Sequence, residues 1–169
     1  MKEFKRKYPQ DYFKAVNRRE KRFKEQLYHF FPQEKIIKII ENIEIKTDKG
    51  NTDIDAILYD KEENILALFQ LKWQDPFYNS MTERFSRITN LIPKSIEWID
   101  KIVSLLSNNS VKSILKTLKI NVDVNELDDV FIFVLSREHV NFTNQKLDKR
   151  AIWASWYQIF STLPADSNN

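Results

Sequence analysis

The chain has no cysteine, and its 169 residues include only one glycine and two histidines. Without cysteine there is neither a disulfide framework nor a thiolate metal site, so we expect a reducing compartment. His29 and His139 lie far apart in the sequence and are a poor basis for a zinc site. Any metal site must therefore use oxygen ligands, which suit Mg²⁺ or Mn²⁺.

Long apolar runs are missing as well. No segment approaches the roughly 20 consecutive apolar residues of a membrane-spanning helix, and the first residues lack the apolar core of a signal peptide. We therefore expect a cytoplasmic protein. The apolar residues, 42% of the chain, are enough for the core of one globular domain.

The two signs of charge are unevenly distributed. Residues 1–25 contain ten Lys and Arg against four Asp and Glu, whereas residues 41–63 contain eight acids against three lysines. A basic flank beside an acidic centre is expected of a phosphate-binding rim around a metal site. A solvated basic helix explains the same charges, and both interpretations stay open at this point.

The sequence predicts a basic N-terminal extension over residues 1–17, one domain over residues 18–163 and a disordered tail over residues 164–169. Apolar residues at helical spacing predict an amphipathic helix from Arg18 to about Phe31, ended by Pro32. The extension is either a docking arm or a helical continuation.

Three short strands are predicted next, over residues 43–47, 52–59 and 65–73. The turn at residues 48–51 contains Gly50, at a position where a backbone with positive φ is expected. Because the connections are short, the strands should form an antiparallel meander.

The rest of the chain predicts an α/β fold, with a central mixed sheet flanked by helices. A parallel crossover strand joins the meander, because the connection that precedes it is long. Pro93 should kink or divide the first long helix. The predicted elements are helices over residues 85–106 and 110–120, strands over residues 129–136 and 151–155, and a helix over residues 156–163.

A few polar residues stand where these strands should be apolar. Strand side chains alternate between faces, so Gln70 and Lys72 share one face, and Asp53 and Asp55 share a face of the preceding strand. In a hairpin, Asp55 falls near the level of Gln70. Since unpaired buried polar groups are costly, these residues should share a polar partner or a metal ion.

A single divalent ion fits this arrangement. Asp55, the Gln70 carbonyl oxygen and the backbone carbonyl of Leu71 are its expected ligands, with Asp53 as an alternative acid. Lys72 would then orient or deprotonate a water molecule and stabilise charge on a phosphate. A buried salt bridge, with the amide as a third partner, is the structural alternative.

The pattern resembles the PD-(D/E)xK nuclease superfamily, with its restriction-endonuclease-like fold, and looks closest to nuclease-related domains and Holliday-junction-resolvase-like members. The signature is an acid on the second strand and a later strand that ends acid-x-Lys, and Asp55, Gln70 and Lys72 match these positions. The resemblance covers residues 18–163. It implies a three-layer fold and Mg²⁺-dependent hydrolysis of DNA phosphodiester bonds.

Many members of the superfamily also carry a glutamate in the preceding helix. Glu20 fits it best, because Phe23 and Leu27 follow at the offsets of a buried face, and Glu25 is the alternative. Gln70 departs from the usual carboxylate, which favours one metal ion over two. This departure leaves open a catalytically inactive relative that binds nucleic acid or docks to a protein.

Five arginines complete the expected nucleic-acid-binding set. Arg84 and Arg87 are three residues apart on a predicted helix, so they share a face that can contact a phosphate, although solvent exposure or a pair with Glu83 explains them equally well. The expected partner is DNA, with no membrane. The resemblance also leaves room for a homodimer and for association with a larger DNA-processing protein. The basic N-terminal segment supplies the other three arginines, Arg18, Arg19 and Arg22.

Overall fold

The computed structural model describes residues 2–31, 34–73, 81–137, 142 and 146–162. Among these, the side chains of residues 2, 4, 5, 81–89 and 160–162 lie outside the description. The expected tail over residues 164–169 and His139 also lie outside the described residues.

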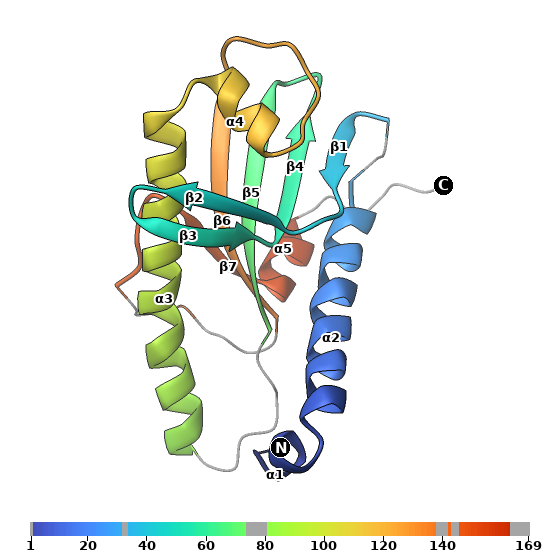
Figure 1. Cartoon of the computed structure of the whole chain (residues 1–169), viewed down its shortest axis with the longest axis vertical. Coiled ribbons are helices and arrows are strands. Elements are labelled where there is room, and N and C mark those ends of the chain that lie inside the picture. Colours follow the sequence, from blue (N-terminus) through green and yellow to red (C-terminus); the bar gives the residue numbers. More distant parts are fainter. Residues whose placement is uncertain (1, 32–33, 74–80, 138–141, 143–145, 163–169) are drawn as a thin grey trace.

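A five-stranded mixed sheet forms the centre of the molecule, in the strand order β1-β4-β5-β6-β7 (Figure 1). Strands β1, β4 and β5 are antiparallel neighbours, and β6 and β7 run parallel to β5. The predicted mixed sheet with a parallel crossover strand is confirmed. The strands are β1 (Ile36–Ile39), β4 (Ala56–Asp60), β5 (Ile65–Trp73), β6 (Asp129–Arg137) and β7 (Ile152–Ser155).

The predicted three-stranded meander is wrong. Strands β2 (Ile43–Thr47) and β3 (Gly50–Ile54) pair only with each other, in a separate two-stranded sheet. The segment expected to be one strand over residues 52–59 is divided at Asp55 into β3 and β4. Residues 36–39, which were not assigned, supply β1 and take the edge position beside β4.

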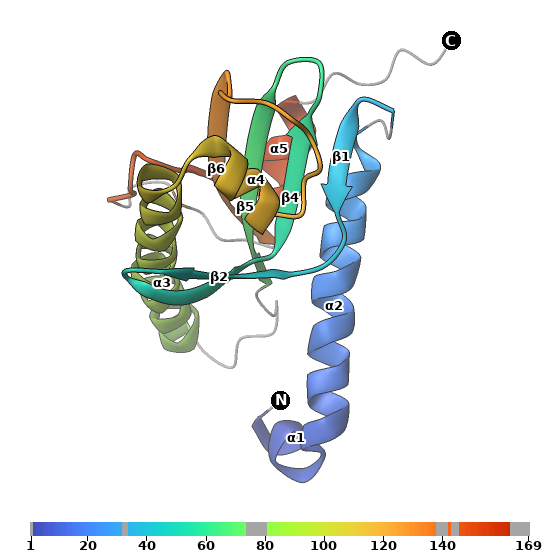
Figure 2. The same cartoon turned by 45° about the horizontal axis from the view of Figure 1, so that its top comes forward.

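The helices form layers on both faces of the sheet. The side chains of α3 and α4 pack on one face together with the β2–β3 hairpin, and those of α2 and α5 pack on the other (Figures 1 and 2). Helix α3 continues through Pro93. The helices are α1 (Lys2–Lys7), α2 (Pro9–His29), α3 (Met81–Asn108), α4 (Val111–Thr117) and α5 (Trp156–Thr162).

Helix α2 is longer than predicted. It begins at Pro9, so the expected boundary between residues 17 and 18 lies inside one helix. Its C-terminal half packs on the sheet through Phe23, Leu27 and Tyr28, while its N-terminal half projects beyond the sheet together with α1 (Figure 2). Within the described part of the chain, no helix is long and apolar enough to cross a membrane.

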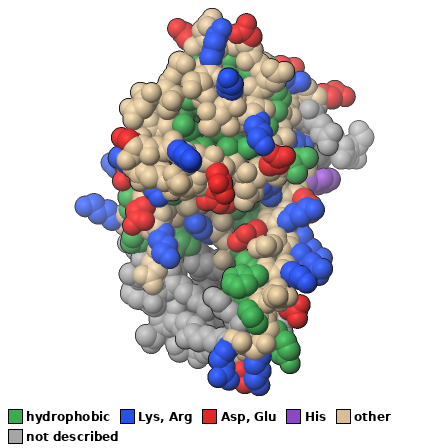
Figure 3. Space-filling view, viewed as in Figure 1, with side chains coloured by type: hydrophobic (Ala, Val, Ile, Leu, Met, Phe, Trp, Pro, Cys, Tyr) green, Lys and Arg blue, Asp and Glu red, His purple; other side chains and the backbone are tan. Residues whose placement is uncertain are grey.

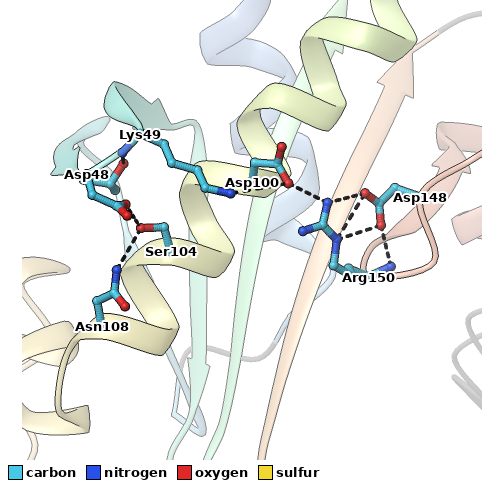
Figure 4. A network of polar contacts seen from close by, with 8 residues as sticks. Asp48, Lys49, Asp100, Ser104, Asn108, Asp148 and Arg150 are labelled. Atoms are coloured by element: carbon cyan, nitrogen blue, oxygen red, sulfur yellow. Dashed lines mark hydrogen bonds and ion pairs between the residues drawn. The ribbon is translucent and has the colours of Figure 1, made fainter.

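Polar contacts attach the β2–β3 hairpin to α3 (Figure 4). Trp98 Nε1 donates to the Asp53 carbonyl at 2.7 Å, and Ser104 Oγ donates to Asp48 in the hairpin turn. Gly50 has φ +102° in that turn, as the sequence predicts. Lys49 in the same turn lies with its Nζ 4.0 Å from Asp100 Oδ1 on α3. Asp100 also pairs with Arg150, whose guanidinium pairs in turn with Asp148 before β7. The hairpin is thereby held over one face of the main sheet.

Arg137 fills an aromatic enclosure at the C-terminal end of β6. Its guanidinium carbon lies 4.9 Å from the ring centroid of Trp73, 5.5 Å from that of Trp156 and 5.6 Å from that of Phe23. The guanidinium also donates to Gln26 Oε1 on α2. These contacts join α2, β5, β6 and α5, so Arg137 stabilises the end of the sheet where α2 docks.

We predict that Arg137→Met lowers the free energy of unfolding by about 1–2 kcal/mol, because it keeps the apolar stem but loses the cation–π contacts and the hydrogen bond. Urea unfolding followed by circular dichroism measures the change. Arg18→Met, at an exposed position of α2, removes the same charge and should change the free energy of unfolding by less than about 0.5 kcal/mol. Equal effects of the two substitutions would contradict the stabilising role of Arg137.

Candidate functional site

Asp55 and Gln70 lie opposite each other where β4 begins and β5 approaches its end. The register pairs Ala56 with Phe69, which places the preceding Asp55 across from Gln70. Two hydrogen bonds extend the pairing, because Asp55 N donates to the Phe69 carbonyl at 3.2 Å and Leu71 N donates to Asp55 Oδ2 at 2.7 Å. The sequence prediction that Asp55 lies at the level of Gln70 is confirmed by this register.

The alternation predicted through Asp55 is wrong, because the strand ends there. One continuous strand would place Ile54 on the face opposite Ile57 and Tyr59, but all three belong to the same core cluster. The Asp55 carboxylate takes the Leu71 N–H, and β3 turns away to pair with β2 and contact Trp98. The alternation of side chains between faces along β3 therefore does not continue in step into β4.

Asp55 is a largely buried acid. Burial raises the pKa of its carboxyl to about 6, and the negative charge of Asp53 adds to this effect. The hydrogen bond from Leu71 N and the positive charge of Lys72 oppose the rise. Near neutral pH the carboxylate is thus ionised, but at a cost in stability.

Lys72 lies on the same side of β5 as Gln70, two residues along. Burial lowers the pKa of its ammonium, while the negative charges of Asp55, Asp53 and Glu20 raise it in part. The pair of residues predicted on β5 is thus accompanied by acids on α2, on β3 and at the bend between β3 and β4.

Glu20, rather than Glu25, lies with this group. Partial burial raises the pKa of the Glu20 carboxyl, and the positive charge of Lys72 is the largest opposing effect. Glu25 instead lies near Lys21, with 3.8 Å between Lys21 Nζ and Glu25 Oε1. The structure therefore brings Asp53, Asp55, Gln70, Lys72 and Glu20 to one region.

Lys24 is a member of the site that the sequence analysis missed. It is only 8% exposed, and its Nζ donates to the Ile40 carbonyl at 3.1 Å and to Asn42 Oδ1. Burial lowers its pKa, opposed by the charges of Asp55, Asp53 and Glu20 in that order. The sequence did contain a signal for this role. Lys24 lies beside Phe23 in the apolar stripe that also holds Leu27, and a lysine in such a stripe needs a polar partner.

Gln70 has an unused acceptor. Its side chain is 7% exposed, and its Oε1 is buried with no hydrogen-bond partner among the described residues. An orphaned amide oxygen beside a carboxylate fits one oxygen-liganded divalent ion. Among the described residues, no group of three His, Cys, Asp or Glu side chains is arranged to bind a metal.

The five predicted arginines differ in exposure and lie on two helices. Arg18 and Arg22 are exposed on α2, and Arg19 is half-buried. Arg84 and Arg87 lie in the first turns of α3, and their side chains are outside the described part of the structure. The basic residues on the N-terminal side of the site are thus placed on one helix that also carries Glu20.

A groove of about 1080 Å³ reaches the site from the side of α2. Its walls are α2 and the segment from Ile36 to Asn42, and Asp55 and Leu71 lie within it. Glu20, Lys24 and Tyr28 contribute from the helix. The groove makes one end of the acidic group accessible to a ligand larger than a water molecule.

We predict that Asp55→Asn stabilises the protein at pH 8 by about 2–3 kcal/mol when divalent metals are removed with EDTA, and changes it little at pH 4. The pKa of Asp55 is raised on folding, so the native state keeps a proton that the unfolded chain loses between about pH 4 and pH 6. The stability of the native protein therefore falls as the pH rises through this range. Asparagine cannot ionise, and its side-chain oxygen can still accept the Leu71 N–H.

Urea unfolding of both proteins across this pH range measures the difference. Asp128→Asn, at an exposed position remote in sequence from the site, is the control and should show no pH-dependent gain of this size. A constant difference between Asp55→Asn and the unchanged protein from pH 4 to pH 8 would contradict the prediction.

Comparison with known proteins gives no relative from which roles can be transferred. No protein-family model, no curated protein and no solved structure matches the chain. The chemistry of the site is therefore argued from its own residues, which are the Asp55 carboxylate, the Gln70 amide, two lysines with lowered pKa values and two further acids.

Proposed function

We propose that the chain is a metal-dependent nuclease that hydrolyses DNA phosphodiester bonds and has a restriction-endonuclease-like fold. The observation that carries the proposal is the meeting of Asp55, Gln70 and Lys72 across β4 and β5, with Glu20 beside them on α2. The central mixed sheet with helices on both faces supports the proposed fold.

Asp55 and Gln70 would hold the divalent ion, Mg²⁺ or Mn²⁺, with the Leu71 carbonyl as a further ligand. When bound, the ion supplies Lewis-acid stabilisation of charge on a phosphate. Asp55 suits this role because its carboxylate is fixed by the Leu71 N–H at 2.7 Å. The orphaned Gln70 Oε1 would gain the partner that it lacks among the described residues. Glu20 would act as an outer ligand.

Lys72 would position the attacking water and the scissile phosphate. Burial lowers the pKa of its ammonium, and the negative charges of three acids oppose this effect in part. A positive group held near the phosphate stabilises the charge that develops in the transition state. Arg18, Arg19 and Arg22 on α2 would bind neighbouring phosphates, and Arg84 and Arg87 remain candidates for the same role.

Lys24 favours a second candidate, a nuclease-fold module that binds nucleic acid or docks to a protein without cleavage. Its buried ammonium lies within the field of Asp55, Asp53 and Glu20 and offsets negative charge that would attract a metal ion. Because Gln70 is also neutral, the site carries little net negative charge. Cleavage and its dependence on Lys72 separate the two candidates.

We predict that the purified protein cleaves DNA in Mg²⁺ or Mn²⁺ and that Asp55→Ala and Lys72→Met each lower the rate at least ~100-fold, because each removes a group that contacts the metal ion or the phosphate. Plasmid DNA and single-stranded DNA are incubated with and without EDTA, and products are resolved on gels. Melting curves establish that the variants are folded.

Glu25→Ala is the matched control for Glu20→Ala, because both glutamates lie on α2 and line the groove. Glu20→Ala should slow cleavage, and Glu25→Ala should leave it nearly unchanged. Absence of metal-dependent cleavage, or cleavage that survives Asp55→Ala, would contradict the nuclease proposal.

A further inference from the structure

We infer that Ser136 is a positioning residue, whose hydroxyl holds the Gln70 amide through a bridging water so that the amide oxygen faces the divalent ion. This inference deepens the proposed function and rests on it for the metal-binding role of Gln70 and Asp55. The coupling between Ser136 and Gln70 is argued from the fold, and it can be measured without cleavage.

Buried polar atoms that lack a partner are concentrated on one face of the sheet. Four buried side-chain N or O atoms have no hydrogen-bond partner among the described residues, and two of them, Gln70 Oε1 and Ser136 Oγ, lie on the adjacent strands β5 and β6. A third, Ser95 Oγ, lies on α3 one turn before Trp98, in the helix that packs on this face. A buried polar atom left unpaired is costly, so these atoms need a ligand.

Gln70, Lys72 and Ser136 share that face. Strands β5 and β6 are parallel, and their register places Gln70 opposite Val134 and Lys72 opposite Ser136. Val134 belongs to the core cluster beneath α3, and side chains alternate along a strand, so Ser136 lies on the same side as Val134. The serine is fully buried there. Its hydroxyl is thus brought beside the two β5 residues of the candidate site.

This position is separate from the surface along α2. Helix α2 packs on the opposite face of the sheet, and Lys and Arg side chains gather along it at the surface (Figure 3). Ser136 is enclosed between β6 and the layer that contains α3. The inference therefore concerns a contact inside the protein that acts on a residue of the site.

Ser136 lies diagonally across from Gln70, at a separation that one water molecule can span. Neighbouring strands are about 4.8 Å apart and two residues extend about 6.6 Å, so the two Cα atoms are roughly 8 Å apart. Buried waters typically make two to four hydrogen bonds with buried polar groups that otherwise lack a partner. Gln70 Oε1 and Ser136 Oγ are both atoms of this kind. A water that donates to each of them satisfies both oxygens.

The orientation of the amide decides whether Gln70 can bind an ion. The oxygen of a glutamine amide has two lone pairs, whereas its NH₂ group only donates and would repel a cation. The water bonded to Ser136 occupies one lone pair of Oε1 and leaves the other for the ion. Contacts of this kind, one step removed from the metal, commonly change metal affinity 10–100-fold. A carboxylate at this position would present an oxygen at either end and would not need such a contact.

A serine that is merely buried would behave differently. Removing an unpaired hydroxyl relieves its desolvation penalty, so Ser136→Ala would then stabilise the protein by the same amount whatever residue stands at position 70. A hydroxyl that bonds to Gln70 through water instead makes the effects of the two residues depend on each other.

The first experiment is a double-mutant cycle in EDTA. Urea unfolding gives the unfolding equilibrium constants of the unchanged protein, Ser136→Ala, Gln70→Met and the double variant. We expect the two substitutions to depart from additivity by at least five-fold, because either one removes a partner of the shared water. The matched cycle pairs Gln70→Met with Ser155→Ala, which removes a hydroxyl at the level of Ser136 but one strand farther from β5, and it should be additive within two-fold.

The second experiment measures Mn²⁺ binding by isothermal titration calorimetry. Loss of binding in Asp55→Ala identifies the ion as the one held by the candidate site. Ser136→Ala should weaken Mn²⁺ binding about ten-fold. The same substitution made together with Gln70→Glu should weaken binding less than two-fold relative to Gln70→Glu alone, because a carboxylate has no wrong orientation. Ser155→Ala should leave the affinity within two-fold in both backgrounds.

Three results would overturn the inference: an additive Ser136–Gln70 cycle, an equal loss of Mn²⁺ affinity with glutamine and with glutamate at position 70, or no Mn²⁺ binding. Failure of the nuclease proposal has a different signature. Coupling together with Mn²⁺ binding through Asp55, but without cleavage of DNA, would keep the role of Ser136 and reject the enzyme. Cleavage that depends on Asp55, together with an additive cycle, would retain the enzyme and reject the role of Ser136.

Discussion

The hydrogen bond from Leu71 N to Asp55 Oδ2 is the contact on which the candidate site depends. The Asp55 carboxylate accepts a backbone N–H of β5 at the point where β4 begins. Strand β3, which precedes Asp55, therefore does not pair with β5 and leaves the main sheet. The departing β3 then forms the hairpin that contacts α3 through Trp98. The Asp55 carboxylate thus lies where β3 ends, opposite Gln70. It also lines the groove along α2.

The electrostatics of the site follow from bringing charges of both signs to a poorly solvated place. Burial raises the pKa of Asp55 and lowers that of Lys72 and Lys24, so each group resists its charged form, while the opposite charges around it favour that form. Such an arrangement contributes little net stability in comparison with apolar packing. The presence of these charges beside the groove is more readily understood if the groups bind a ligand.

The sequence was sufficient to predict the mixed sheet and the level of Asp55 and Gln70, because the short connection after Asp60 determines the register of β4 and β5. It could not predict the break at Asp55, since residues 52–59 contain neither the glycine nor the proline that usually marks the end of a strand. The break depends on a tertiary contact, as does the docking of Lys24 against Ile40. Strand β1 was missed because its four residues are part of a longer isoleucine-rich run.

The separation of the β2–β3 hairpin from the main sheet affects where the chain can change in length. Residues added at the hairpin turn near Gly50 would lengthen two strands that pair only with each other, leaving Asp55 opposite Gln70. One residue added between Asp60 and Ile65 would instead shift β4 against β5 and turn Asp55 toward the other face. Insertions are therefore expected to accumulate at the hairpin among divergent forms of this fold, while the length of the β4–β5 connection stays constant.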